Sequence, residues 1–220
     1  MSTALVLLSG GQDSATCAAW AAARFERIEC LSFFYGQKHR RELEAAERIA
    51  ALFRAPWRTV DIPALYAHPS SSLTNSKLAH AATAQGELPV SFVPGRNLIF
   101  LTTAASLALG RGIADIVTGV CQTDYSGYPD CRADTISALE RALKLGNAGF
   151  GRAADLRIHT PLMELTKAQT VKMARELPKG WEALAMSWTC YEGGAKPCGE
   201  CPACELRKKG FAEAGETDPA

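Results

Sequence analysis

The chain has 220 residues, of which 47% are hydrophobic and 21% are charged, and its 24 Lys and Arg residues nearly balance its 23 Asp and Glu residues. The length favours one α/β domain with a small appendage, and the composition excludes disordered, collagenous and coiled-coil chains. A net charge of +1 gives no general reason to expect binding to nucleic acid or to a membrane. The apolar stretches at residues 4–8 and 98–109 are short or interrupted, so we expect no signal peptide, no membrane span and a cytoplasmic location.

Short apolar runs alternate with helix-favouring stretches along most of the chain. In chain order we predict strand 3–8, helix 13–24, strand 28–35, helix 37–54, strand 57–62, helix 94–110, strand 115–120, helix 133–145, strand 156–161, helix 166–177 and helix 205–214. Strands joined by helices need crossover connections. This alternation of strands and helices predicts an α/β fold with a doubly wound, mostly parallel sheet covered on both faces.

In the remaining segments, the hydrophobic residues show no sustained helical or strand period. Residues 67–93 predict a lid, a binding loop or a disordered stretch, and residues 121–131 a loop. The composition changes near the C-terminus, which predicts a main domain over residues 1–185 and a cysteine-containing segment over residues 186–220, with a tail that frays.

A glycine turn joins the first predicted strand to the first helix. Its sequence is Leu8-Ser9-Gly10-Gly11-Gln12-Asp13-Ser14. Unpaired backbone N–H groups and the helix dipole make an anion site at such a helix start, and glycines allow a phosphate to approach the backbone. Asp13 would hold a Mg²⁺ that bridges phosphate oxygens, or would cap the helix. The more common G-x-x-x-x-G-K-[ST] and G-x-G-x-x-G patterns do not occur here.

Four of the eight cysteines lie close together, in the pattern Cys190-x₇-Cys198-x₂-Cys201-x₂-Cys204. Four thiolates complete a tetrahedral Zn²⁺ shell, which favours one structural zinc ion. The alternatives are an iron–sulfur cluster, in which the fourth cysteine commonly follows the other three, and unligated thiols. We expect the other cysteines to be core or loop residues; they are Cys17, Cys30, Cys121 and Cys131.

Further polar residues stand where open parallel sheets bind ligands. Arg96 and Asn97 open a predicted helix, where Arg would face phosphates and Asn would read a base edge. Lys167 is a cation at a helix start, which needs an anion opposite it, and is our candidate for a phosphate contact that neutralises transition-state charge. Lys38 and His39, at the start of the helix predicted over 37–54, invite the same interpretation.

The loop that follows the strand at 115–120 carries the candidate substrate-binding residues Asp124, Tyr128, Asp130 and Arg132. One carboxylate can accept both adjacent N–H donors of a guanine-like base, so Asp124 or Asp130 would read such a base, and Arg132 would pair with a carboxylate or a phosphate. Turn formation is the alternative role for Asp130.

Residues 9–14 resemble the signature of the PP-loop ATP pyrophosphatases, a superfamily with an adenine nucleotide alpha hydrolase-like fold. Further motifs narrow the resemblance to the 7-cyano-7-deazaguanine synthase (QueC) family of queuosine and deazapurine biosynthesis, from residue 4 to about 211. They are Tyr35-Gly36-Gln37-Lys38-His39, Val93-Pro94-Gly95-Arg96-Asn97, the run from Asp124 to Arg132, Thr160-Pro161-Leu162 and Thr189-Cys190-Tyr191.

The resemblance implies a ligase that converts 7-carboxy-7-deazaguanine and ammonia to the 7-cyano compound through an amide, with two ATP. It implies ATP, Mg²⁺ and Zn²⁺ as cofactors, Asp13 and Lys167 as catalytic residues, ATP contacts at residues 8–14, 96 and 97, and a homodimer. Whether ATP yields AMP and pyrophosphate or ADP and phosphate stays open.

Two other functions compete with this one. Another PP-loop synthetase that forms an amide or a thio group would need a glutaminase domain, for which 220 residues leave no room, or a tRNA substrate, which a near-neutral chain does not favour. A zinc-ribbon module that binds nucleic acid predicts a basic patch around the cysteines, but Glu residues dilute the Lys and Arg residues there.

Overall fold

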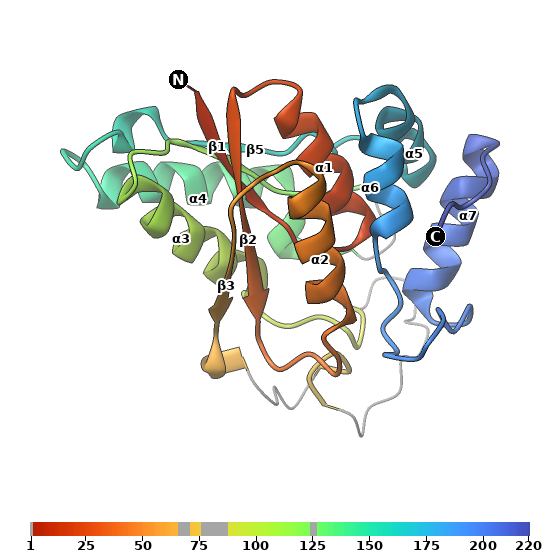
Figure 1. Cartoon of the computed structure of the whole chain (residues 1–220). Helices are drawn as coiled ribbons and strands as arrows, with labels where there is room; N and C mark the ends of the chain where they lie inside the picture. Colours follow the sequence, from red (N-terminus) through yellow and green to blue (C-terminus); the bar gives the residue numbers. More distant parts are fainter. Residues whose placement is uncertain (1, 66–70, 76–87, 124–126) are drawn as a thin grey trace.

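The computed structural model describes residues 2–65, 71–75, 88–123 and 127–220. At its centre lies a five-stranded sheet in the order β3-β2-β1-β4-β5 (Figure 1). The strands are β1 (Thr3–Leu7), β2 (Arg27–Phe34), β3 (Trp57–Asp61), β4 (Asp115–Val117) and β5 (Arg157–His159). All four pairings are parallel, which confirms the predicted sheet.

Seven α-helices occur in the described part of the chain. They are α1 (Gln12–Ala22), α2 (Arg41–Leu52), α3 (Arg96–Leu109), α4 (Ala133–Gly146), α5 (Lys167–Glu176), α6 (Gly180–Met186) and α7 (Pro202–Ala214). The sequence did not predict α6, because seven residues between loops are too few to show a period. Thr166 caps α5 as predicted, through a capping box with Gln169.

The prediction that a helix begins at residue 37 is wrong. Gly36 has a φ of 83°, and the side chain of Gln37 accepts from Tyr35 N at 2.9 Å and donates to Phe33 O at 3.2 Å. These bonds hold the chain in a turn, and α2 starts only at Arg41. Lys38 therefore lies in the turn that precedes the helix, not in its first turn.

Alternate side chains of β1 supply both faces of the sheet. Ala4 and Val6 pack in one cluster with residues of α1 and α2, whereas Leu5 and Leu7 pack in the other with residues of α3 and α4. Each fully buried aliphatic side chain contributes roughly 1.5–3 kcal/mol. Helices thus cover both faces, as the doubly wound prediction requires (Figure 1).

The C-terminal segment is held firmly against the main body. Phe211 of α7 is buried with residues of α5 and α6. The guanidinium of Arg207, which is 8% exposed, donates to both oxygens of Asp218, at 2.6 and 2.8 Å, and to Thr189 Oγ1 at 3.0 Å. The prediction that the tail frays is wrong for Asp218, because this ion pair anchors it.

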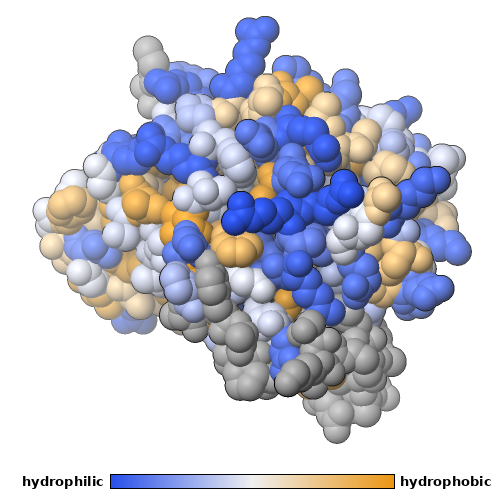
Figure 2. Space-filling model, turned by 60° about the horizontal axis from the view of Figure 1, so that its bottom comes forward, coloured by the Kyte–Doolittle hydropathy of each residue, from blue (hydrophilic) through white to orange (hydrophobic). Residues whose placement is uncertain are grey.

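The order of the strands places a topological switch point between β1 and β4, where parallel sheets bind ligands at the carboxyl ends of the strands. The face turned forward in Figure 2 mixes strongly hydrophilic residues with smaller hydrophobic areas. Among the described residues, none of the helices combines the length and the apolar character that crossing a membrane requires.

Candidate functional site

The glycine turn lies at the carboxyl end of β1, directly before α1. Gly10 has a φ of 93°, and a Cβ on it would lie 1.9 Å from the carbonyl oxygen of Glu42. Only glycine fits, because a side chain would be strained and would collide with the backbone of α2. Close packing of the turn against α2 therefore fixes its shape.

The two serines of the turn stabilise this shape. Ser14 Oγ accepts from Gly10 N at 3.1 Å and lies 3.0 Å from Ser9 Oγ, while Gly11 N donates to Ser9 Oγ at 3.2 Å. The N-cap of α1 is Gly11, and no side chain caps the helix. Asp13 is therefore not a helix cap, which removes one of its two predicted roles and leaves the helix start available to an anion.

Asp13 and Lys167 form an ion pair across the site. Lys167 Nζ donates to Asp13 Oδ1 at 2.9 Å and to Oδ2 at 2.7 Å. The side chain of Lys167 is 9% exposed and that of Asp13 29%. Gly119, after β4, packs closely against the start of α1, since a Cβ there would lie 3.2 Å from Asp13 Cβ. Asp13 is thus the anion that a cation at the start of α5 requires.

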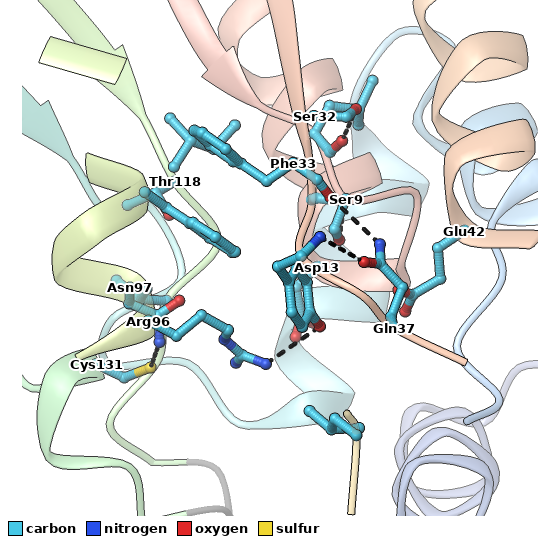
Figure 3. Close-up of a pocket in the computed structure, with 18 of the residues that line it drawn as sticks. Ser9, Asp13, Ser32, Phe33, Gln37, Glu42, Arg96, Asn97, Thr118 and Cys131 are labelled. Atoms are coloured by element: carbon cyan, nitrogen blue, oxygen red, sulfur yellow. Dashed lines mark hydrogen bonds between the residues drawn. The ribbon is translucent and has the colours of Figure 1, made fainter. Parts of the chain in front are cut away.

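A cavity of about 320 Å³ opens beside this pair (Figure 3). Its volume is in the range of small-molecule sites. The residues that line it come from the glycine turn, the ends of β2 and β4, and the starts of α2 and α3; they include Leu8, Ser9, Asp13, Ser14, Phe33, Tyr35, Gln37, Lys38, His39, Glu42, Arg96, Asn97, Phe100, Gly119, Tyr128, Cys131, Cys190 and Tyr191. Segments far apart in the sequence therefore meet at one site.

One wall of the cavity is aromatic and carries a half-buried cation, Arg96. The rings of Phe33 and Phe100 stack 4.3 Å apart. The Arg96 guanidinium carbon lies 5.6 Å from the ring centroid of Tyr35 and 5.8 Å from that of Tyr128, and Arg96 donates to the Tyr35 hydroxyl at 3.4 Å. Flat faces beside a planar cation suit an aromatic heterocycle.

The loop after β4 contributes less to the cavity than the sequence predicts. Asp130 is 5% exposed, and its Oδ2 accepts from Asn97 N at 3.0 Å, which satisfies a backbone donor at the start of α3. Arg132 is exposed and precedes α4, while Tyr128 lines the cavity. Asp124 lies outside the described residues.

Glu42 is a residue to which sequence analysis assigns no role, yet it lines the cavity. Burial raises the pKa of Glu42 to about 7, and the charge of Arg96 offsets part of that shift. One feature of the sequence could have drawn attention to Glu42. Glu42 lies one and two turns before Ala46 and Ile49, both fully buried, so it is a charged residue at the start of an apolar stripe.

The four clustered cysteines converge in the structure. The Sγ atoms of Cys190, Cys198, Cys201 and Cys204 all lie within 4.8 Å of one another. Backbone N–H groups point at the sulfurs; Cys198 N donates to Cys190 Sγ at 3.3 Å, and Cys201 N donates to Cys198 Sγ at 3.3 Å. Bonds from the backbone of Glu200 and Cys201 lower the pKa of Cys198 to about 7. The donor set and its spacing fit a four-coordinate metal ion.

This cysteine cluster adjoins the cavity. Cys190 and Tyr191 line it, Trp188 N donates to Gly10 O at 2.8 Å, and His39 Nε2 lies 3.2 Å from Cys190 O. Lys38 Nζ lies 3.7 Å from a Glu192 oxygen. The segment that carries the cysteines therefore supports the glycine turn and closes one side of the site.

The four scattered cysteines are buried, as predicted. Burial raises the pKa of Cys30 and of Cys131 to about 12, with neighbouring acids adding to both shifts. A raised pKa disfavours the thiolate form, so burial works against a nucleophilic role for Cys131, although it lines the cavity.

Known proteins are similar to this chain over nearly its whole length. A family model described as "Queuosine biosynthesis protein QueC" matches residues 3–215. The chain belongs to the QueC family. Two proteins named 7-cyano-7-deazaguanine synthase resemble this QueC chain closely. That of Laribacter hongkongensis is 52% identical over 218 residues, covering 98% of this chain and 93% of the relative. That of Chromobacterium violaceum is 51% identical over 220 residues, covering 98% and 92%.

Solved structures show the fold of this QueC chain at much lower identity. A "predicted subunit of tRNA methyltransferase" from Methanocaldococcus jannaschii superposes with a TM-score of 0.51 at 16% identity, over 99% of this chain and 90% of that one. A 4-thiouridine synthetase in complex with RNA and ATP superposes with a TM-score of 0.50 at 17% identity, over 97% and 50%. The PP-loop fold predicted from residues 9–14 is confirmed.

Proposed function

We propose that this chain is a 7-cyano-7-deazaguanine synthase, which uses ATP to convert 7-carboxy-7-deazaguanine and ammonia to the nitrile. The observation that carries the proposal is the glycine turn at a helix start, next to the Asp13–Lys167 pair and a cavity with aromatic walls. Relatives of that name, about half identical over nearly the full length, support the substrate class.

The reaction must make an inert oxygen leave. A carboxylate resists ammonia because its charge is delocalised and oxide is a poor leaving group. ATP transfers a phosphorus-containing group to a carboxylate oxygen, ammonia attacks the carbonyl carbon, and the activated oxygen departs with its electron pair to give the amide. A second ATP activates the amide oxygen, and loss of that oxygen and of two nitrogen-bound protons gives the nitrile.

The glycine turn would bind the polyphosphate through residues 8–14, in particular through the N–H group of Gln12. Mg²⁺ takes one or two carboxylates together with phosphate oxygens, and the chemistry of Asp13 fits this need. Lys167 would then exchange Asp13 for phosphate oxygens and stabilise the charge that develops on them. Bound Mg²⁺ would neutralise polyphosphate charge.

The aromatic half of the cavity would hold the base. We propose that Tyr128 stacks on it, and that Arg96, which lies against Tyr35 and Tyr128, faces the base and not the phosphates that the sequence suggests. Asn97, which donates to Cys131 Sγ at 3.2 Å, lines the same wall. Asp124, Asp130 and Arg132 stay predictions as substrate-binding residues.

We propose that the four cysteines hold one structural Zn²⁺, because a shell of four thiolates is complete and leaves no position for chemistry. Residues 1–185 would form the nucleotide-binding domain and residues 186–220 the zinc segment. A homodimer in the cytoplasm is expected from the family resemblance alone. Light scattering on purified protein and fractionation of cells test these two expectations.

Mass spectrometry of products tests the proposed function. Protein incubated with 7-carboxy-7-deazaguanine, ammonium and MgATP is expected to form the amide and then the nitrile, with two ATP consumed for each nitrile. The Lys167→Met variant is expected to form neither product while still binding the base. An active preparation that consumes ATP but leaves the deazapurine unchanged would refute the proposal.

A further inference from the structure

The carboxyl group of Glu42 is a feature that the proposed reaction does not yet use. Glu42 stands in the first turn of α2 and lines the cavity. Asp13, the other carboxylate that lines the cavity, is engaged with Lys167, and the nearby Asp130 with the backbone of Asn97. Within the described ranges, no hydrogen-bond donor or ion-pair partner binds the oxygens of Glu42. The two oxygens of Glu42 are therefore available to accept hydrogen bonds from a ligand.

A cation and two tyrosine rings line the cavity together with Glu42. Arg96 of α3 lies near enough for its charge to act on Glu42, but the two groups form no ion pair among the described contacts. Figure 3 shows Glu42 extending from α2 and Arg96 from α3, with their charged ends directed toward the space between these helices. Tyr35 and Tyr191 line the same cavity as Glu42.

We propose that Glu42 and Arg96 together read the guanine-type edge of the substrate, an inference that rests on the proposed function. That edge presents a carbonyl oxygen, a ring N–H and an exocyclic amino group in a row. The two oxygens of a carboxylate match the two adjacent donors, and a guanidinium donates to the carbonyl oxygen. The rings of Tyr35 and Tyr191 line the cavity near these two groups, and Tyr128 supplies the face on which the base stacks.

The charges argue against ammonium as the ligand of Glu42. Arg96 and Lys38 line the same cavity and are both cations, so a further cation would meet repulsion there. A neutral base with two N–H donors meets no such cost. It also stabilises the ionised form of a carboxyl group that burial has made hard to ionise.

The test compares two substrates and three proteins. The substrates are 7-carboxy-7-deazaguanine and its analogue that lacks the exocyclic amino group. The proteins are the unaltered chain, Glu42→Gln, and Glu44→Gln as a matched control on the same helix, where Glu44 is exposed. The readouts are kcat and KM for each deazapurine and for ATP, and equilibrium binding of each deazapurine without ATP.

We expect the unaltered chain to prefer the amino-bearing substrate by about 10- to 100-fold in kcat/KM, the range for a hydrogen bond to a charged group. Glu42→Gln is expected to lose most of this preference through KM and binding, with KM for ATP unchanged, and Glu44→Gln to retain it. The preference is a ratio, so a partly unfolded variant still reports it.

Three results would overturn the inference. If Glu42→Gln keeps the full preference, Glu42 does not read the amino group, although the proposed function stands. If the variant binds both deazapurines normally but needs more ammonium, Glu42 acts on ammonia instead. If the unaltered protein converts neither deazapurine while it binds and hydrolyses ATP, the proposed function fails and the inference fails with it.

Discussion

The ion pair between Asp13 and Lys167 predicts that Asp13→Asn lowers the stability of the protein without nucleotide. Removing one partner of a buried pair costs about 3–5 kcal/mol, because the remaining charge is left uncompensated. Lys167 is 9% exposed but Asp13 is 29% exposed, so water screens the pair in part, and we expect a loss of about 2–3 kcal/mol. For a chain of this size that is a fall in Tm of about 5–10 °C.

A double-mutant cycle measures the coupling. Lys167→Met alone is expected to cost less than Asp13→Asn, because the remaining carboxylate reaches water. The double variant, which leaves no buried charge, is expected to recover about 1–3 kcal/mol relative to the sum of the single changes. Urea unfolding at neutral pH and low salt gives these free energies. Asp155→Asn is the matched control, since its pair with Arg152 is exposed on both sides and its loss is expected to change little.

Two results of this double-mutant cycle would contradict the predicted coupling. Strictly additive free energies, or an Asp13→Asn variant as stable as the unaltered chain, would show that the pair does not couple these side chains. Either result would mean that Asp13 can be replaced without loss of folding stability.

Three more outcomes follow from the geometry. Gly10→Ala is expected to prevent stable folding, because its Cβ would lie 1.9 Å from a carbonyl oxygen, whereas Gly112→Ala, with φ of 73° but open space, costs about 1 kcal/mol; urea unfolding compares them. Cys201→Ser is expected to lower both the bound metal, measured by elemental mass spectrometry, and Tm. The folded-state pKa of Glu42, about 7 against an ordinary 4.5, means that the folded chain holds the extra proton. Stability should therefore fall as pH rises from 4.5 to 7, by at most about 3 kcal/mol, and Glu42→Gln should remove this part of a calorimetric pH profile.

Most of the fold and the convergence of the four cysteines could be predicted from local sequence patterns. Alternating strand and helix signals predict the order of elements up to β5, because each element follows from its own residues. The spacing of the four cysteines predicts their convergence because Pro197, Gly199 and Pro202 permit tight turns between them. The glycine turn is also local, and its conformation follows from one strand, one helix and the φ of Gly10.

The roles of single polar residues depend on long-range contacts that no local pattern contains. Lys167 meets Asp13 across 154 positions of sequence, and Asp130 meets Asn97 across 33. The sequence therefore identifies all four as polar residues near a ligand site, but not that they bind one another. Glu42 belongs to the same group, since its helix carries the usual charged residues and only the neighbouring α3 distinguishes it.

The clamp between Arg207 and Asp218 has a practical consequence. The same guanidinium that holds the end of the chain also donates to Thr189, the residue before Cys190, and Cys190 is part of the cavity wall. Removing the residues from Asp218 onward would therefore take away the ion-pair partner of a guanidinium that also binds beside the metal-binding cluster. Arg207 thus connects the end of the chain to the four-cysteine cluster and, through Cys190, to the wall of the cavity.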